Sequence, residues 1–182
     1  MSRTQDLSLA RPLAFLLAMS ATVSLHAEPT TFFERMASFC GMTFSGHEVP
    51  VGGNPARFEG QVMTATVASC EPNELRMPFV IGDDHSRTWV LTQSDDGALT
   101  LKHDHRHEDG TPDEVTNYGG TAKQPGNSWQ VSFPADAFTA ELIPEAAGNV
   151  WTLILDPKTG GLTYDLKRDG KDRFRATLYQ SH

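Results

Sequence analysis

The feature that most constrains this chain is a change in hydrophobic period near residue 41. Beyond that point, short segments alternate apolar with more polar side chains, and in 75–81 every second residue is large and apolar. Alternation with a period of two is typical of β-strands, whose successive side chains point to opposite faces. Clusters rich in Gly, Asp, Asn and Pro separate the segments and predict turns. The predicted strands are 61–70, 75–81, 88–92, 99–102, 129–133, 138–142, 150–155, 162–167 and 174–179.

Strands at near-regular spacing, without helices between them, predict a mostly β fold. We expect a single antiparallel β-barrel of about eight to ten strands, with a β-sandwich as the alternative, because spacing does not reveal strand order. One short N-terminal helix is expected over 31–39. Phe32, Phe33, Met36 and Phe39 recur there at helical spacing, and Gly41 follows as a helix breaker.

The first 27 residues are typical of a signal peptide. Arg3 and Arg11 give a basic start, residues 12–25 are largely apolar, and Ala27 supplies a small residue before Glu28. The apolar run of about 14 residues is shorter than the roughly 20 that a membrane-spanning helix needs, so an uncleaved anchor is the weaker alternative. We therefore expect a bacterial periplasmic or secreted protein whose mature part, 28–182, is a single β-barrel domain.

The charge of the chain argues against several classes of partner. There are 15 Lys and Arg residues against 23 Asp and Glu, a formal net charge of −8. Removal of 1–27 takes away two arginines and one aspartate, which changes the net charge to −9. An acidic surface repels phosphate backbones and anionic lipids, so no nucleic-acid partner is expected. No segment after residue 28 has the apolar length of a membrane span. The oligomeric state is left open.

Cys40 and Cys70 are the two cysteines of the chain. An isolated pair in an oxidising compartment most often forms a disulfide bond. That bond would close a loop of about 31 residues, which the chain-entropy model values at about 3–4 kcal/mol. A reactive or metal-binding thiol pair is the alternative, and it lacks the close Cys-x-x-Cys spacing.

The most informative segment is 97–109, which contains His103, His105 and His107. On one strand these three imidazoles share a face with Leu99 and Leu101, about 6.5–7 Å apart along the strand. The opposite face is expected to meet solvent. Histidines in this arrangement predict either a site for a transition metal such as Zn or the wall of a metal-free pocket. A purely structural role at a strand end is the third interpretation.

Three further residues are candidates for ligand binding: Arg87, Trp89 and Tyr118. Arg87 lies in 82–89, a charged segment between two strands, which the pattern also explains as an ordinary turn. Trp89 offers a flat apolar face and Tyr118 a hydroxyl. The chain contains no Gly-rich phosphate loop, Gly-x-Ser-x-Gly turn or His-Glu-x-x-His helix, so no catalytic residue is assigned.

Two resemblances add to these expectations. Five segments carry the first resemblance: 86–91, 101–110, 115–120, 133–136 and 149–151. In them the chain is similar to a family of uncharacterised exported bacterial proteins, which implies export but no activity. More loosely, the leading helix, the glycine-bearing segment 41–46, the hairpins and an arginine in the last strand resemble lipocalin-like (calycin) barrels. That resemblance implies a container for one small molecule.

The first functional hypothesis is therefore a secreted or periplasmic β-barrel that binds a small molecule or a metal ion at a histidine-lined mouth. The second is an enzyme of the same fold that uses the histidines for metal-assisted or acid–base chemistry. The third is a structural envelope protein without a ligand. Turnover of a bound compound would separate the first two, and ligand occupancy would separate both from the third.

Overall fold

The computed structural model describes residues 29–53, 55–123 and 127–181. The predicted signal peptide, 1–27, lies outside these residues. In chain order the elements are α1 (Phe32–Ala37), β1 (Thr43–Glu48), β2 (Met63–Thr66), β3 (Ser69–Glu71), β4 (Glu74–Ile81), β5 (Asp84–Gln93), β6 (Leu99–His105), β7 (Tyr118–Thr121), β8 (Gln130–Pro134), α2 (Ala137–Leu142), the 3-10 turn η1 (Pro144–Ala146), β9 (Asn149–Leu155), β10 (Leu162–Arg168) and β11 (Lys171–Gln180).

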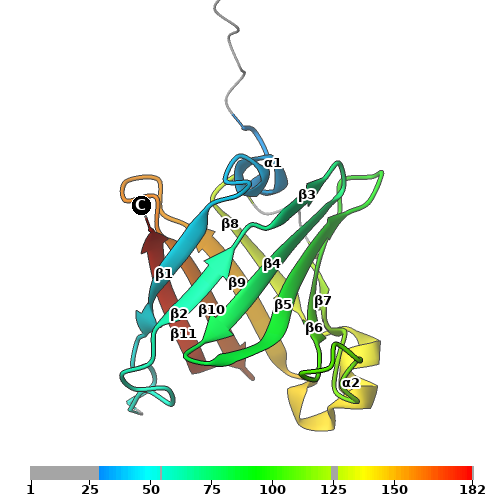
Figure 1. Cartoon of the computed structure of the whole chain (residues 1–182). Helices are drawn as coiled ribbons and strands as arrows, with labels where there is room; N and C mark the ends of the chain where they lie inside the picture. Colours follow the sequence, from blue (N-terminus) through cyan, green and yellow to red (C-terminus); the bar gives the residue numbers. More distant parts are fainter. Residues whose placement is uncertain (1–28, 54, 124–126, 182) are drawn as a thin grey trace, which may run out of the picture.

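Ten of these strands form a nearly closed antiparallel barrel (Figure 1). Their order is β7-β6-β5-β4-β2-β1-β11-β10-β9-β8, and the short β3 pairs with β4 beside this path. Neighbouring strands follow one another along the chain, and the pairing of β1 with β11 joins its two ends. The prediction of a mostly β fold with a single antiparallel barrel is confirmed. The seam lies between β7 and β8, where the Asp136 amide donates a hydrogen bond to the Gly119 carbonyl oxygen.

Two glycines permit the close approaches that this closure needs. A Cβ atom at Gly46 would lie 2.1 Å from the carbonyl oxygen of Thr177, across the β1–β11 pair. A Cβ atom at Gly120 would lie 1.8 Å from the carbonyl oxygen of Pro134, across the seam. Both distances are far below van der Waals contact, so any other residue would force the strands apart.

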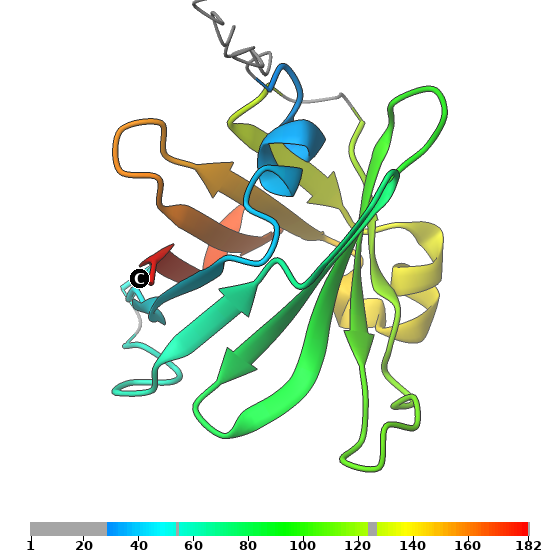
Figure 2. The same ribbon diagram turned by 45° about the horizontal axis from the view of Figure 1, so that its top comes forward.

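Helix α1 covers one end of the barrel, as Figure 2 shows from that side. Thr31 and Glu34 form a capping box at its N-terminus, which satisfies amide groups that the first turn leaves free. Its apolar face, Phe32, Phe33 and Met36, is buried in the core. The predicted N-terminal helix is confirmed, although it ends at Ala37. The barrel core that it covers includes Phe44, Met63, Leu75, Met77, Leu91, Leu101, Phe133, Leu153 and Leu178.

The predicted disulfide between Cys40 and Cys70 is confirmed. It joins the segment after α1 to β3, and so ties the helix to the barrel end that it covers. Among the described residues, no helix has the length and apolar character needed to span a membrane.

One predicted strand is wrong. Residues 138–142 were expected to be extended, but they belong to helix α2. Asp136 caps this helix by accepting a hydrogen bond from the Thr139 amide. The Thr139 hydroxyl in turn bonds to the backbone of Gly119, so α2 packs beside the seam rather than continuing the sheet.

Candidate functional site

The barrel end opposite α1 contains a cavity of about 520 Å³. The loop between β1 and β2 and the ends of β4, β5, β6, β7, β10 and β11 that lie away from α1 contribute its wall. Aromatic side chains and arginines dominate the lining. The lining residues are Arg57, Phe58, Phe79, Ile81, Arg87, Trp89, His103, His105, Tyr118, Tyr164, Leu166, Arg168, Arg173 and Phe174.

His103 lies at the buried base of the cavity, with 2% of its surface exposed. Its Nδ1 lies 3.2 Å from the carbonyl oxygen of Tyr118, and its Nε2 lies 2.8 Å from the Tyr164 hydroxyl oxygen. Burial lowers the pKa of His103 to about 3, so the ring is neutral near pH 7. Because a carbonyl oxygen can only accept, Nδ1 carries the proton and Nε2 accepts from Tyr164.

His105 follows on the same side of β6 and is half-buried nearer the mouth. Its Nε2 lies 3.0 Å from the hydroxyl oxygen of Tyr118. Burial, and next the positive charge of Arg87, lower the pKa of His105 below its ordinary value. A hydrogen bond therefore joins the neutral ring to the Tyr118 hydroxyl.

The two tyrosines complete this polar group. Burial raises the pKa of Tyr118 to about 12, and burial also raises the pKa of Tyr164 well above its ordinary value. Both hydroxyls therefore keep their protons at neutral pH, and the Tyr164 hydroxyl donates a hydrogen bond to His103. Their oxygen lone pairs remain available to accept a hydrogen bond from a ligand.

Trp89 forms the centre of an aromatic wall. Its ring stacks on both Phe79 and Tyr164, with centroid distances of 4.3 Å and 4.5 Å, and those two rings also lie 6.0 Å from each other. The Tyr118 ring stacks on the imidazole of His103 at 4.7 Å. Phe79, Trp89 and Tyr164 are buried, so their rings form the floor of the cavity, while the partly exposed ring of Tyr118 is a flat surface suited to contact with a planar ligand.

The structure brings five of the six sequence-predicted ligand-binding residues to the cavity: His103, His105, Arg87, Trp89 and Tyr118. Arg87 donates a 2.6 Å hydrogen bond to Asp84. Burial by itself would raise the pKa of Asp84, but hydrogen bonds from Ser86 and Arg87 outweigh it and lower the pKa to about 2. This carboxylate is therefore charged and partly neutralises Arg87.

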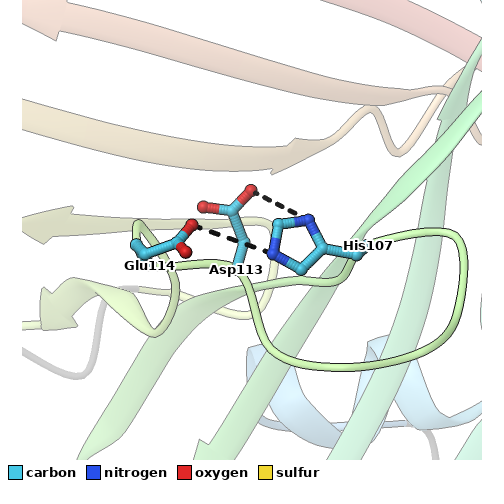
Figure 3. Close-up of side chains that lie close together, drawn as sticks. All are labelled: His107, Asp113 and Glu114. Atoms are coloured by element: carbon cyan, nitrogen blue, oxygen red, sulfur yellow. Dashed lines mark ion pairs between the residues drawn. The ribbon is translucent and has the colours of Figure 1, made fainter.

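His107 lies elsewhere. Strand β6 ends at His105, and His107 is exposed in the loop that follows. As Figure 3 shows, its ring lies between two carboxylates: Nδ1 is 3.9 Å from Asp113 and Nε2 is 3.8 Å from Glu114. Within the described residues, this is the group of three whose ligand atoms could hold a metal ion. The three histidines are not brought together as one set of ligands.

The outward face of β6 also differs from expectation. It was expected to meet solvent, but Asp104 is 5% exposed. Arg76 and Arg106 cover its carboxylate, with shortest nitrogen–oxygen distances of 2.6 Å and 2.9 Å. Three charge-assisted hydrogen bonds from these two arginines offset the cost of burying this charge.

Sequence reasoning missed three arginines of the mouth: Arg57, Arg168 and Arg173. A β-bulge interrupts the β10–β11 register, where Leu166 is opposite Phe174 and Lys167 is opposite Asp172. Arg173 is left without a partner across the ladder, and the bulge redirects it, so both Arg173 and Phe174 line the cavity.

Comparisons with known proteins add no relative: no family model, no curated protein and no solved structure matches the chain. The barrel is compatible with the calycin-like expectation in architecture alone. The resemblance to a family of exported bacterial proteins has no support from these comparisons.

Proposed function

We propose that this protein is a secreted or periplasmic β-barrel that binds one small molecule in the cavity at its open end. The observation that carries the proposal is the cavity of about 520 Å³ between His105, Tyr118 and Trp89. Ligand sites typically measure about 300–1,000 Å³ and combine apolar walls with a few convergent polar groups. This cavity has that composition, with an aromatic wall and two imidazole–hydroxyl pairs.

Native mass spectrometry of the protein purified from the periplasm, without an affinity tag, tests this proposal. We expect a bound mass in the wild type that His105→Ala loses. His107→Ala is the matched control, since it removes the same side chain outside the cavity and should retain the bound mass. A ligand-free mass for the wild type, or a mass that His105→Ala retains, would contradict the proposal.

Export is part of the same proposal. The Cys40–Cys70 disulfide supports an oxidising compartment, because such bonds are rare in the reducing cytoplasm. The same mass spectrum should show a mature chain that begins at Glu28, two hydrogens lighter than its dithiol form. A mature chain that still begins at Met1 would contradict cleavage of 1–27.

Metal binding is a second candidate function, and one specific observation favours it. The ligand atoms of His107, Asp113 and Glu114 all lie within 4.8 Å of one another. Imidazole with carboxylates suits Zn among other divalent ions. Titration with Zn²⁺ by calorimetry should give binding that His107→Ala abolishes and His105→Ala retains. Equal binding by both variants would contradict this site.

An enzyme of the same fold remains the alternative to a binding protein. The neutral imidazole of His105 can accept a proton, so in such an enzyme it would act as the general base on the bound compound. Chemical identification of the compound released from the cavity, before and after incubation with the protein, separates the two. Conversion of that compound would support the enzyme.

A further inference from the structure

The mouth of the cavity has the opposite charge to the chain as a whole. The chain has a net charge of −8, yet the residues that line this cavity include four arginines and no aspartate or glutamate. The arginines come from segments far apart in the sequence: Arg57 from the β1–β2 loop, Arg87 from β5, Arg168 from β10 and Arg173 from β11. The fold therefore gathers them at one opening.

Most of this positive charge is not neutralised by the protein. Arg87 is paired with Asp84. Arg168 uses its Nε to donate to the side-chain oxygen of Asn149, a neutral partner. Arg57 and Arg173 form no ion pair with any residue that the structure describes, and both are exposed. Guanidinium groups gathered at an opening repel one another, and an anion between them would relieve that repulsion.

The field of one of these arginines reaches the base of the cavity. The charge of Arg87 is the largest cause of the lowered pKa of His105 after burial, and it also lowers the pKa of His103, where burial, His105 and Lys102 have larger effects. Because both imidazoles are neutral at pH 7, they add no positive charge of their own. They and the tyrosine hydroxyls are left as neutral hydrogen-bonding groups above an aromatic wall.

We propose that the cavity takes an organic anion with a planar apolar body. The body lies against the partly exposed rings of Phe58, Tyr118 and Phe174. An acid group such as a carboxylate, sulfonate or phosphate lies near the four arginines at the mouth. This inference rests on the proposed function, since it names the chemical class of the ligand for the same cavity. Guanidinium binds such oxyanions through paired N–H donors, which explains arginine rather than lysine at all four charged positions.

A pair of fluorescent probes that share a planar body tests this class. One is 8-anilino-1-naphthalenesulfonate, which is anionic, and the other is N-phenyl-1-naphthylamine, which is neutral. We expect the wild-type protein at pH 7.5 and low salt to bind the anionic probe more tightly than the neutral probe by about tenfold. Added NaCl should weaken the binding of the anionic probe and leave the binding of the neutral probe unchanged, because salt screens exposed charges.

The double variant Arg57→Gln/Arg173→Gln provides the sharpest measurement. These side chains make no ion pair within the described residues, so the barrel should fold without them. Affinity for the anionic probe should fall by about three- to tenfold, with little change for the neutral probe. Lys158→Gln is the control, because it removes one positive charge from the exposed turn between β9 and β10, at the barrel end that α1 covers.

The outcomes separate this inference from the proposed function. If the wild type binds both probes with equal affinity and His105→Ala binds neither, the cavity is a small-molecule site. The inference that its ligand is an anion would then be overturned. The wild type could also bind the anionic probe more tightly than the neutral one while the double variant shows the same preference. That result would overturn the inference that Arg57 and Arg173 bind the acid group. If neither probe binds, the planar anionic ligand is overturned, and native mass spectrometry of the purified protein still decides the proposed function.

Discussion

The two ends of this barrel are built from different chemistry. At the α1 end, Phe32, Phe33 and Met36 fill the opening, and the Cys40–Cys70 disulfide ties the segment behind the helix to β3. Arg35 is also engaged at that end, since its guanidinium lies 3.6 Å from the ring centre of Trp129 and its Nε donates to the Ser128 carbonyl.

At the opposite end most of the positive charge has no carboxylate partner among the described residues. Histidines and tyrosines there bond to one another in neutral pairs, and three arginines have no carboxylate partner among the described residues. Sites built for a ligand are often left with groups that the fold itself does not satisfy. The difference between the two ends therefore indicates that the α1 end contributes most to stability and that the open end binds the ligand.

The largest effect should come from Phe32→Ala at the α1 end. This side chain is 1% exposed, and truncation of a buried phenylalanine typically costs about 3–5 kcal/mol of unfolding free energy. Urea unfolding measures that loss. The matched variant is Phe174→Ala in the half-buried wall of the cavity, which should lose less stability but more affinity for the naphthalene probes. A larger loss of stability in Phe174→Ala, with a larger loss of affinity in Phe32→Ala, would contradict this separation of stability and binding.

Loss of the disulfide should have a similar effect on stability and none on the cavity. The variant Cys40→Ala/Cys70→Ala frees a loop of about 31 residues, and we expect it to lose about 3–4 kcal/mol of unfolding free energy. Reduction of the wild-type protein should give a similar urea midpoint. Binding of the naphthalene probes below the unfolding transition should stay unchanged, and weaker binding would show that the two ends are coupled.

Acid should destabilise the open end through His103. Its pKa is about 3 in the folded protein and near 6.5 when unfolded, so the unfolded chain binds more protons between these values. Stability is therefore intact above pH 6.5 and falls by about 1.4 kcal/mol per pH unit below it. The charged or titratable groups around this ring are Lys102, Arg87, His105, Tyr118 and Tyr164.

Urea unfolding at pH 7 and pH 5 measures this effect in the wild type and in His103→Gln. The variant should lose about 2 kcal/mol less than the wild type over this interval, because it has no proton to bind at that position. Parallel losses in the two proteins would show that His103 stays accessible to protons in the folded state.

The architecture could be predicted because its determinants are local. Strand β4 spans 74–81, and the alternation of side chains predicted 75–81. The disulfide was predicted because an isolated cysteine pair in an oxidising compartment most often forms such a bond. Helix α2 was missed because the predicted segment, 138–142, has only five residues. Such a short segment does not distinguish the helical period of 3.6 residues from the strand period of two. The Asp136 cap, an aspartate before the segment, was the available signal.

The charge of the site could not be predicted in the same way. The mouth arginines are separated by up to about 116 positions along the chain, and only the strand pairing brings them together. The bulge that turns Arg173 inward depends on the register of β10 against β11, which alternation does not reveal. Alternation also placed His107 with the other histidines, because it gave no sign that β6 ends at His105.

The smallest effect should be a shift in one titration at the open end. Arg87 lowers the pKa of His105, second only to burial, so Arg87→Gln should move that pKa toward its ordinary value of 6.5. NMR titration of the His105 ring proton measures the shift without requiring any ligand. Lys158→Gln, at the α1 end, should leave it unchanged. If Arg87→Gln also leaves it unchanged, solvent screens the arginine mouth from the cavity, and the open end would lack the positive field on which an anionic ligand depends.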